Sequence, residues 1–171
     1  SFDVRLAVTG SRGEKVVQTL TFHRGSYLID AAFEIANPGS APISPYAYYQ
    51  LTRDTKTAVP QSAWTPVAYT GPVVYSEADK FKKVDFGEID KLAADAKRKA
   101  PFTPKADNGW VAMIEHYFVN AWLPPEDKRE REFYARKLDN GLYAAGVILP
   151  MAPIAPGATG TVKVPLYAGT Q

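Results

Sequence analysis

Residues 109–125 of this 171-residue chain have the sequence GWVAMIEHYFVNAWLPP, and no other stretch says as much about how it folds. Between its glycine and its proline pair, only Glu115, His116 and Asn120 are clearly polar. Leaving the other side chains in water would cost roughly 25 cal/mol for each Å² of apolar surface. We therefore expect this stretch to be buried in the core or in an interface.

The spacing of apolar residues in this stretch fits both a helix and a strand. Trp110 and Ile114 lie at a helical interval, whereas aromatic and β-branched residues favour a strand. Periodicity alone does not decide between the two, but the flanking segments alternate as strands do. We therefore predict one central strand, apolar on both faces and bent near His116, with Trp110 and Trp122 mainly in the core.

Alternation of apolar and polar residues, the pattern of half-buried strands, recurs along most of the chain. Asn140-Gly141 lies between two such runs and is the strongest hairpin signal in the sequence. Pro45 and Pro72 remove backbone donors and so predict edge strands for the runs that contain them. The predicted strands are 2–8, 16–22, 27–35, 43–51, 67–75, 81–86, 132–138, 142–149 and 159–167.

One segment, residues 88–99, has helical spacing, with Ile89 and Leu92 on a narrow apolar face. Acidic residues lead it and Lys97-Arg98-Lys99 end it, which suits the helix dipole. Because the apolar face is rich in alanine, we expect a helix on the surface. The chain is therefore predicted to be mainly β, a single antiparallel β-sandwich domain over residues 1–171 with one or two short helices.

Composition excludes several classes of protein. The hydrophobic content of 46% and the charged content of 22% are typical of a soluble globular protein. A net charge of +2 is too small to indicate nucleic acid or an anionic membrane as the main partner. The absence of cysteine excludes disulfides, thiol catalysis and cysteine-ligated zinc. Strand-like alternation begins at Phe2 without a leader, so we expect a piece of a longer protein.

Residues suited to catalysis or metal binding are few. His23 and His116 are the two histidines, and neither has a second ligand at helical or strand spacing, so we expect structural, hydrogen-bonded roles. Asp85 and Glu88 could act as an acid and a base, but carboxylates at a helix start are more often caps or solvated charges. The sequence holds no nucleophile elbow, phosphate loop or HExxH pattern. We predict no catalytic residue, no metal and no cofactor.

Two charged stretches and one aromatic cluster could form binding surfaces. Residues 80–105 hold eight basic side chains, which could contact lipid headgroups or an acidic partner, or form a solvated face. Residues 126–137 mix both signs of charge and predict an exposed turn.

The aromatic cluster consists of Tyr46, Tyr48 and Tyr49, which follow a proline; Trp64 lies in a separate loop-like context. Aromatic rings in a cleft could stack against a sugar. Core packing or cross-strand pairing is the alternative for most of them.

Four segments together carry a family resemblance: 109–125, FYARKLDNGLYAAGVILP (133–150), IAPGATG (154–160) and LYAG (166–169). They resemble the large periplasmic domain of YidC-type membrane protein insertases from Gram-negative bacteria. FHRGSYLIDAAFEIAN (22–37) is similar to the strand pair that follows the family's fxRgxY turn, so the resemblance covers nearly the whole chain. The residues that mark the family motif are Gly109, Trp110, Tyr117, Phe118, Trp122 and Pro124.

This resemblance implies a β-supersandwich, the fold of galactose-mutarotase-like domains, on the periplasmic side of the inner membrane. It implies a non-catalytic module of an insertase and chaperone that inserts and folds nascent inner-membrane proteins, alone or with the Sec translocon, through a membrane core absent from this chain. The implied partners are SecDF, for which the module would be a docking surface, and SecYEG. The family's domain is longer at its N-terminus, so we expect an N-terminally incomplete part, with a sheet edge or a cleft wall exposed.

The partner-contact face that we predict comprises Trp64, Tyr69, Lys80, Lys82, Lys83, Lys97, Arg98 and Lys99. Two alternatives stay open: a carbohydrate- or peptide-binding module with a ligand cleft, and a mutarotase-like enzyme. The enzyme would need an acid and a base paired across a sugar cleft, and no position matches such a motif.

Overall fold

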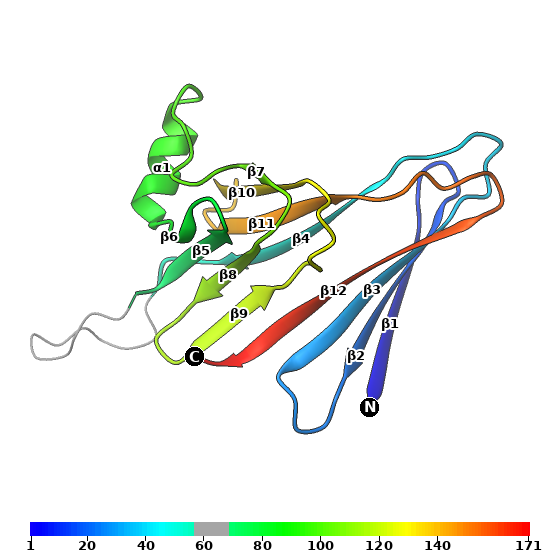
Figure 1. Cartoon of the computed structure of the whole chain (residues 1–171), viewed down its shortest axis with the longest axis horizontal. Coiled ribbons are helices and arrows are strands. Elements are labelled where there is room, and N and C mark those ends of the chain that lie inside the picture. The colour runs from blue at the N-terminus through cyan, green and yellow to red at the C-terminus, as the bar shows by residue number, and fades with distance from the viewer. Residues whose placement is uncertain (57–68) are drawn as a thin grey trace, which may run out of the picture.

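The computed structural model describes residues 1–56 and 69–171, which form two antiparallel sheets (Figure 1). The large sheet has the order β1 (Phe2–Thr9), β2 (Lys15–Phe22), β3 (Leu28–Ala36), β12 (Thr159–Thr170), β9 (Phe118–Trp122), β8 (Trp110–Ile114), β5 (Gly71–Ser76) and β6 (Lys80–Lys83). The small sheet has the order β4 (Tyr46–Arg53), β11 (Tyr143–Pro150), β10 (Arg131–Lys137) and β7 (Lys105–Ala106).

Alternating side chains from both sheets meet in the larger of two hydrophobic clusters. The large sheet contributes Ala31, Phe33 and Val164, and the small sheet contributes Tyr49 and Phe133. The rings of Phe33 and Tyr49 lie 5.7 Å apart, centroid to centroid, across the gap between the sheets. The predicted fold class, an antiparallel β-sandwich with a short helix, is confirmed.

Most strand predictions hold at the level of whole elements. The runs at 2–8, 16–22, 27–35, 132–138, 142–149 and 159–167 correspond to β1, β2, β3, β10, β11 and β12. The run at 43–51 is displaced: Ile43 forms only an isolated bridge with Ile154, and β4 starts at Tyr46. The run at 81–86 ends early as β6, since α1 begins at Phe86. Of the run at 67–75, residues 67 and 68 lie outside the described residues.

The prediction of a single central strand over 109–125 is wrong. This stretch is a β-hairpin of β8 and β9, paired from Val111↔Trp122 to Ile114↔Val119, and the amide of Glu115 donates to the carbonyl of Phe118 (2.8 Å). The polar pair Glu115-His116 lies at the turn, where side chains need not be buried. Both strands are nevertheless central in the large sheet, as their apolar faces require.

The helix α1 (Phe86–Ala94) starts and ends earlier than predicted. The Asp95 carboxylate accepts a hydrogen bond from the backbone amide of Lys97 (2.9 Å), a local contact that competes with helix continuation. Ile89 is fully buried, so one side of α1 is anchored in the core, while the other residues of the helix are half-buried or exposed. Within the described residues, no helix is long and apolar enough to cross a membrane.

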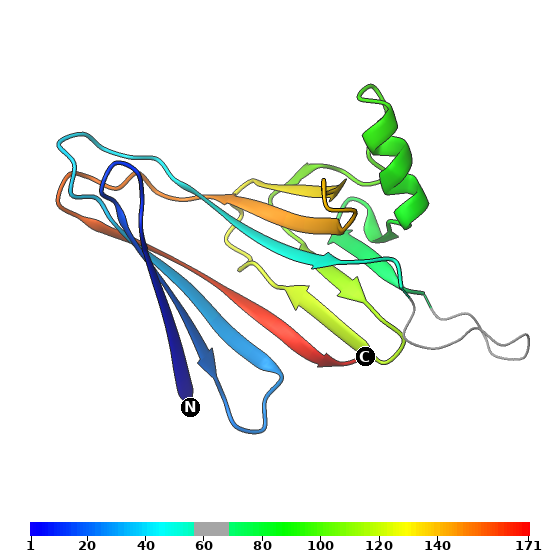
Figure 2. The same ribbon diagram turned by 180° about the vertical axis from the view of Figure 1, so that it is seen from behind.

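One of the two edge-strand predictions is correct. β4 is an edge of the small sheet, but β5 lies between β8 and β6. Pro72 is tolerated there because the β5–β6 pairing begins only at Val73. The outer edge of the large sheet is β1, whose apolar Phe2 and Leu6 stay exposed because the small sheet does not reach over them (Figure 2).

Candidate functional site

The predicted partner-contact face maps to β6 and to the turn that follows α1. Both lie at the same end of the molecule (Figure 1). Lys80, Lys82 and Lys83 are exposed on the edge strand β6, and Lys97 and Lys99 are exposed after α1. None of these five lysines has an ion-pair partner among the described residues. We call these five lysines the β6–α1 basic surface. Trp64 lies outside the described residues.

Two members of the predicted face have structural contacts instead. Arg98 pairs with Glu88 (2.9 Å), which also pairs with Lys91 (2.6 Å), and these hydrogen bonds hold the pKa of Glu88 below its usual value. Tyr69 is half-buried; its hydroxyl donates to the Pro72 carbonyl (2.5 Å) and accepts from the Val84 amide (3.1 Å). Burial raises the pKa of Tyr69 to about 12.

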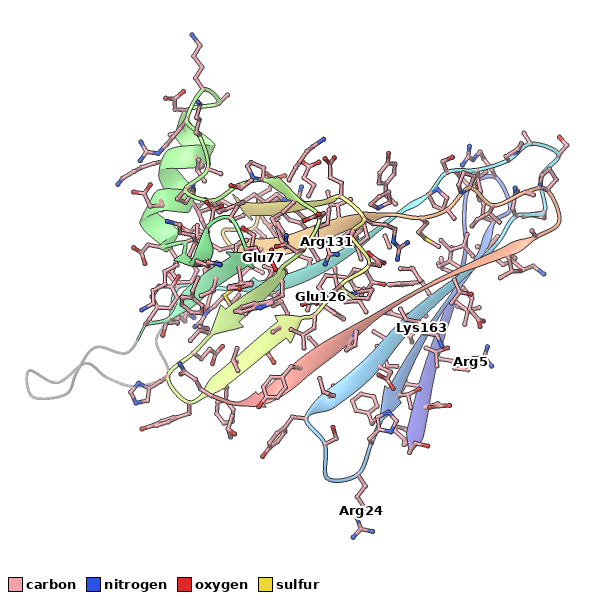
Figure 3. The ribbon with its side chains drawn as sticks, in the orientation of Figure 1. Arg5, Arg24, Glu77, Glu126, Arg131 and Lys163 are labelled. Carbon is pink, nitrogen blue, oxygen red and sulfur yellow. The ribbon has the colours of Figure 1, made fainter. Side chains whose placement is uncertain are left out.

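The family motif is held by a buried cation that sequence reasoning missed. Arg131, which is labelled in Figure 3, is 1% exposed, and its Nη1 donates to the carbonyls of Gly109 (3.2 Å) and Pro124 (3.4 Å). Its Nη2 donates to the carbonyls of Asp107 (3.3 Å) and Pro125 (2.8 Å). The guanidinium thereby joins both ends of the β8–β9 hairpin.

Arg131 also corrects the prediction of an exposed turn at 126–137. Residues 131–137 form β10, and Arg131 faces inward on the same side as Phe133. Burial lowers the pKa of Arg131, while Asp127, 3.6 Å away, opposes that shift. The alternation of residues 131, 133 and 135 could have predicted that Arg131 points inward, but the charged residues around it favoured an exposed turn.

Other motif residues have separate structural roles. Gly109 has φ +100°, and a Cβ there would collide with the Tyr75 carbonyl. Trp110 is half-buried and stacks on the ring of Tyr75 (5.4 Å, 10°), and Trp122 is 8% exposed against Tyr49 (4.9 Å). Tyr117 and Phe118 are exposed at the β8–β9 turn, so they are not part of the core.

The candidate acid–base and metal residues are engaged in ordinary contacts. His23 Nε2 lies 2.8 Å from Asp30 Oδ2 on the surface, as expected for a hydrogen-bonded histidine. His116 packs edge-on against Tyr117 (4.1 Å). Asp85 occupies the N-cap position of α1, but its carboxylate makes no capping hydrogen bond. Across residues 1–56 and 69–171, no group of three or more histidine, aspartate or glutamate side chains is arranged to hold a metal ion.

The tyrosine cluster is divided by strand alternation. Tyr49 points inward and is 2% exposed, and burial raises the pKa of its hydroxyl. Tyr46 and Tyr48 point outward, where they line a cavity of about 400 Å³ together with Tyr134 and Arg136. Tyr49 does not line this cavity, but all three tyrosines line a second one of about 520 Å³.

The family model described as the YidC periplasmic domain matches residues 1–171. The chain belongs to this family. Among curated relatives, the membrane protein insertase YidC of Aromatoleum aromaticum is 51% identical over 168 residues, and that of Dechloromonas aromatica is 50% identical over 169. Each alignment covers 98% of this chain but only 29% of the relative.

A solved structure resembles the YidC periplasmic domain described here in fold alone. It is the structure of an aldose 1-epimerase candidate from Escherichia coli K12, with a TM-score of 0.53 at 11% identity. The superposition covers 99% of this chain and 64% of the epimerase chain. The likeness confirms the galactose-mutarotase-like sandwich. The Gly109 and Pro124 motif residues of the YidC domain are thus the two ends of a central hairpin that Arg131 holds together.

Proposed function

We propose that this chain is a non-catalytic module of a membrane protein insertase and that it provides a docking surface for SecDF and SecYEG. It acts on the periplasmic side of the inner membrane, while a membrane core outside this chain inserts and folds nascent inner-membrane proteins. The observation that carries the proposal is the match to the YidC periplasmic domain family over residues 1–171. We also propose that residues 1–171 work as one domain within a larger periplasmic domain.

The β6–α1 basic surface is the part of the molecule that we assign to docking. Five lysines without ion-pair partners in the described ranges give it a positive field, which favours encounter with an acidic partner surface. β6 is also an edge strand, so its free backbone groups could pair with a strand of the partner.

The size of the molecule leaves ample room for such a footprint. A standard interface buries about 800 Å² per partner, which is less than a tenth of the accessible surface of 10585 Å². β6 and the turn after α1 therefore need not be the whole contact, but they supply its charged part.

The contacts of the titratable residues support a non-catalytic role. His23 is committed to Asp30, and Glu88 to Lys91 and Arg98. Each of these groups therefore has a local partner that accounts for its position.

Charge reversal tests the docking role. Lys80, Lys82 and Lys83 are replaced by glutamate in the full insertase, and SecDF is co-purified from membranes. A matched control carries Arg5→Glu, Arg24→Glu and Lys163→Glu, the same change of charge on the far part of the large sheet (Figure 3). We expect about a tenfold loss of recovered SecDF for the lysine variant only. Equal recovery from both variants would contradict the proposal.

A further inference from the structure

The outer face of the small sheet carries a pocket for which docking gives no role. Side chains from three adjacent strands meet there, because the even-numbered residues of β4, β11 and β10 all point away from the core. The cavity measures about 400 Å³, within the range of small-molecule sites. It is lined by Tyr46, Tyr48, Glu132, Tyr134, Arg136 and Ile148.

The polar corner of this pocket is already organised. Tyr134 donates to the side-chain oxygen of Gln50 (3.0 Å), and Arg136 donates to the same oxygen (3.4 Å). The Gln50 amide nitrogen donates to Thr52 (3.1 Å). A Cβ at Gly146 would collide with the Tyr134 hydroxyl, so the glycine lets this ring lie close against the sheet.

The charges of the pocket are balanced. Glu132 and Arg136 flank Tyr134 on the same face of β10, and neither has an ion-pair partner within the described ranges. A site for phosphate or nucleic acid would need an excess of positive charge. One carboxylate and one guanidinium instead suit a neutral ligand that both donates and accepts hydrogen bonds.

The pocket offers side chains and almost no free backbone. The backbone of β11 is paired with β4 on one side and with β10 on the other. A peptide added as a strand would pair along the open edge of β4, whereas a ligand that lies across this face meets only rings and polar tips. Tyr46 and Tyr48, 69% and 65% exposed, present aromatic surface on which the C–H face of a sugar ring can lie.

We propose that this face binds a neutral saccharide, with Tyr48 against the ring and with Gln50, Glu132 and Arg136 hydrogen-bonded to its hydroxyl groups. Tyr134 is a positioning residue, because its hydroxyl fixes the orientation of Gln50. This site is independent of the docking role: it lies on β4, β11 and β10, not on β6 and α1.

An NMR titration of the isotope-labelled chain with cellobiose and with maltose tests the site. Each sugar is added up to about 50 mM, which covers the millimolar dissociation constants of weak ligands. We expect amide shifts confined to β4, β10 and β11. Tyr48→Ala should weaken binding at least about tenfold, and Tyr134→Phe should weaken it several-fold although the ring is kept.

Tyr117→Ala is the matched control, since Tyr117 is 62% exposed but lies at the β8–β9 turn. This variant should bind sugar as the unmodified chain does. Three results would overturn the proposal. They are no shift with either sugar, equal weakening by Tyr48→Ala and Tyr117→Ala, or shifts of the same amides by a soluble peptide of alternating valine and threonine and not by sugar.

Discussion

The Nη1 atom of Arg131 lies 3.2 Å from the carbonyl oxygen of Gly109, so a buried cation holds the first residue of the family motif. The same nitrogen reaches the carbonyl of Pro124, fifteen residues along the chain from Gly109 (124 minus 109). The hairpin between them carries Val111, Met113 and Trp122 into the core. Closing its two ends with one side chain fixes the position of both central strands.

Replacement of Arg131 by methionine is expected to destabilise the chain by about 3–5 kcal/mol, because buried carbonyl groups would lose their donors. Arg131→Lys keeps the charge but loses the planar fork of donors, so its loss of stability should lie between that of Arg131→Met and zero. Arg129→Met is the control: Arg129 is an exposed neighbour that pairs with Asp127, and its loss should stay below about 1 kcal/mol. Urea unfolding measures the free energy of unfolding of all three variants. Similar losses for Arg131→Met and Arg129→Met would show that Arg131 does not hold the two ends of the hairpin together.

Gly109→Ala should destabilise the chain more than Gly141→Ala does. Both glycines have positive φ, +100° and +77°, so an added Cβ costs about 1–2 kcal/mol at either position. Only at Gly109 would the new Cβ also strike a backbone carbonyl, that of Tyr75; Gly141 has open space around it. Thermal unfolding of the two variants measures the difference in stability. Equal losses of stability would show that the backbone moves easily to separate the new Cβ from the Tyr75 carbonyl.

Tyr49→Phe is expected to leave stability unchanged or to raise it by about 1 kcal/mol. Its buried hydroxyl has no hydrogen-bond partner among the described residues, so removing it ends an uncompensated desolvation. Tyr143→Phe is the matched control, since its hydroxyl bonds to both oxygens of Asp90 (2.9 and 3.0 Å), and should lose about 1 kcal/mol. The denaturant midpoints of the two variants measure the difference. A larger loss of stability for Tyr49→Phe than for Tyr143→Phe would show that the Tyr49 hydroxyl makes a stabilising hydrogen bond.

Ionised Asp90 should stabilise the folded chain, and this stabilisation should be lost in acid. Hydrogen bonds from Lys137 and Tyr143 hold the pKa of Asp90 below its usual value, so protons bind it more weakly in the folded chain than in the unfolded one. The contribution of Asp90 to stability is therefore complete at pH values above its pKa in the unfolded chain. It is lost as the pH falls through the lower pKa that Asp90 has in the folded chain.

Asp90→Asn should thus lower the melting temperature near neutral pH, and the gap to the unmodified chain should close toward about pH 2. Asp139→Asn is the control, because Asp139 is exposed in the β10–β11 turn and forms no ion pair within the described part of the chain. A gap for Asp90→Asn that stays constant with pH would exclude the titration as its cause.

Local patterns sufficed for much of this fold. Period-2 alternation locates β2, β3 and β12, and Asn140-Gly141 marks the β10–β11 hairpin because Gly141 must adopt a positive φ. The family resemblance supplied the sandwich architecture, which alternation alone does not determine.

The misses arise where a distant or backbone partner decides the outcome. The β8–β9 turn has Glu115-His116-Tyr117 in place of the glycine or asparagine that signals a hairpin, so the stretch resembles one strand. Arg131 is buried because four backbone carbonyls accept hydrogen bonds from its guanidinium, and no residue type in the sequence reveals these acceptors. The pocket beside Tyr48 requires the register of three strands, which only the structure supplies.

Photo-crosslinking in membranes tests the docking claim most directly. A photoreactive residue is placed at position 82 or 99, on the β6–α1 basic surface, or at position 163 on the outer face of β12, in the complete insertase. Our account predicts that positions 82 and 99 capture SecDF or SecYEG subunits and that position 163 captures neither. Capture from position 163 alone, or from none of the three, would contradict it.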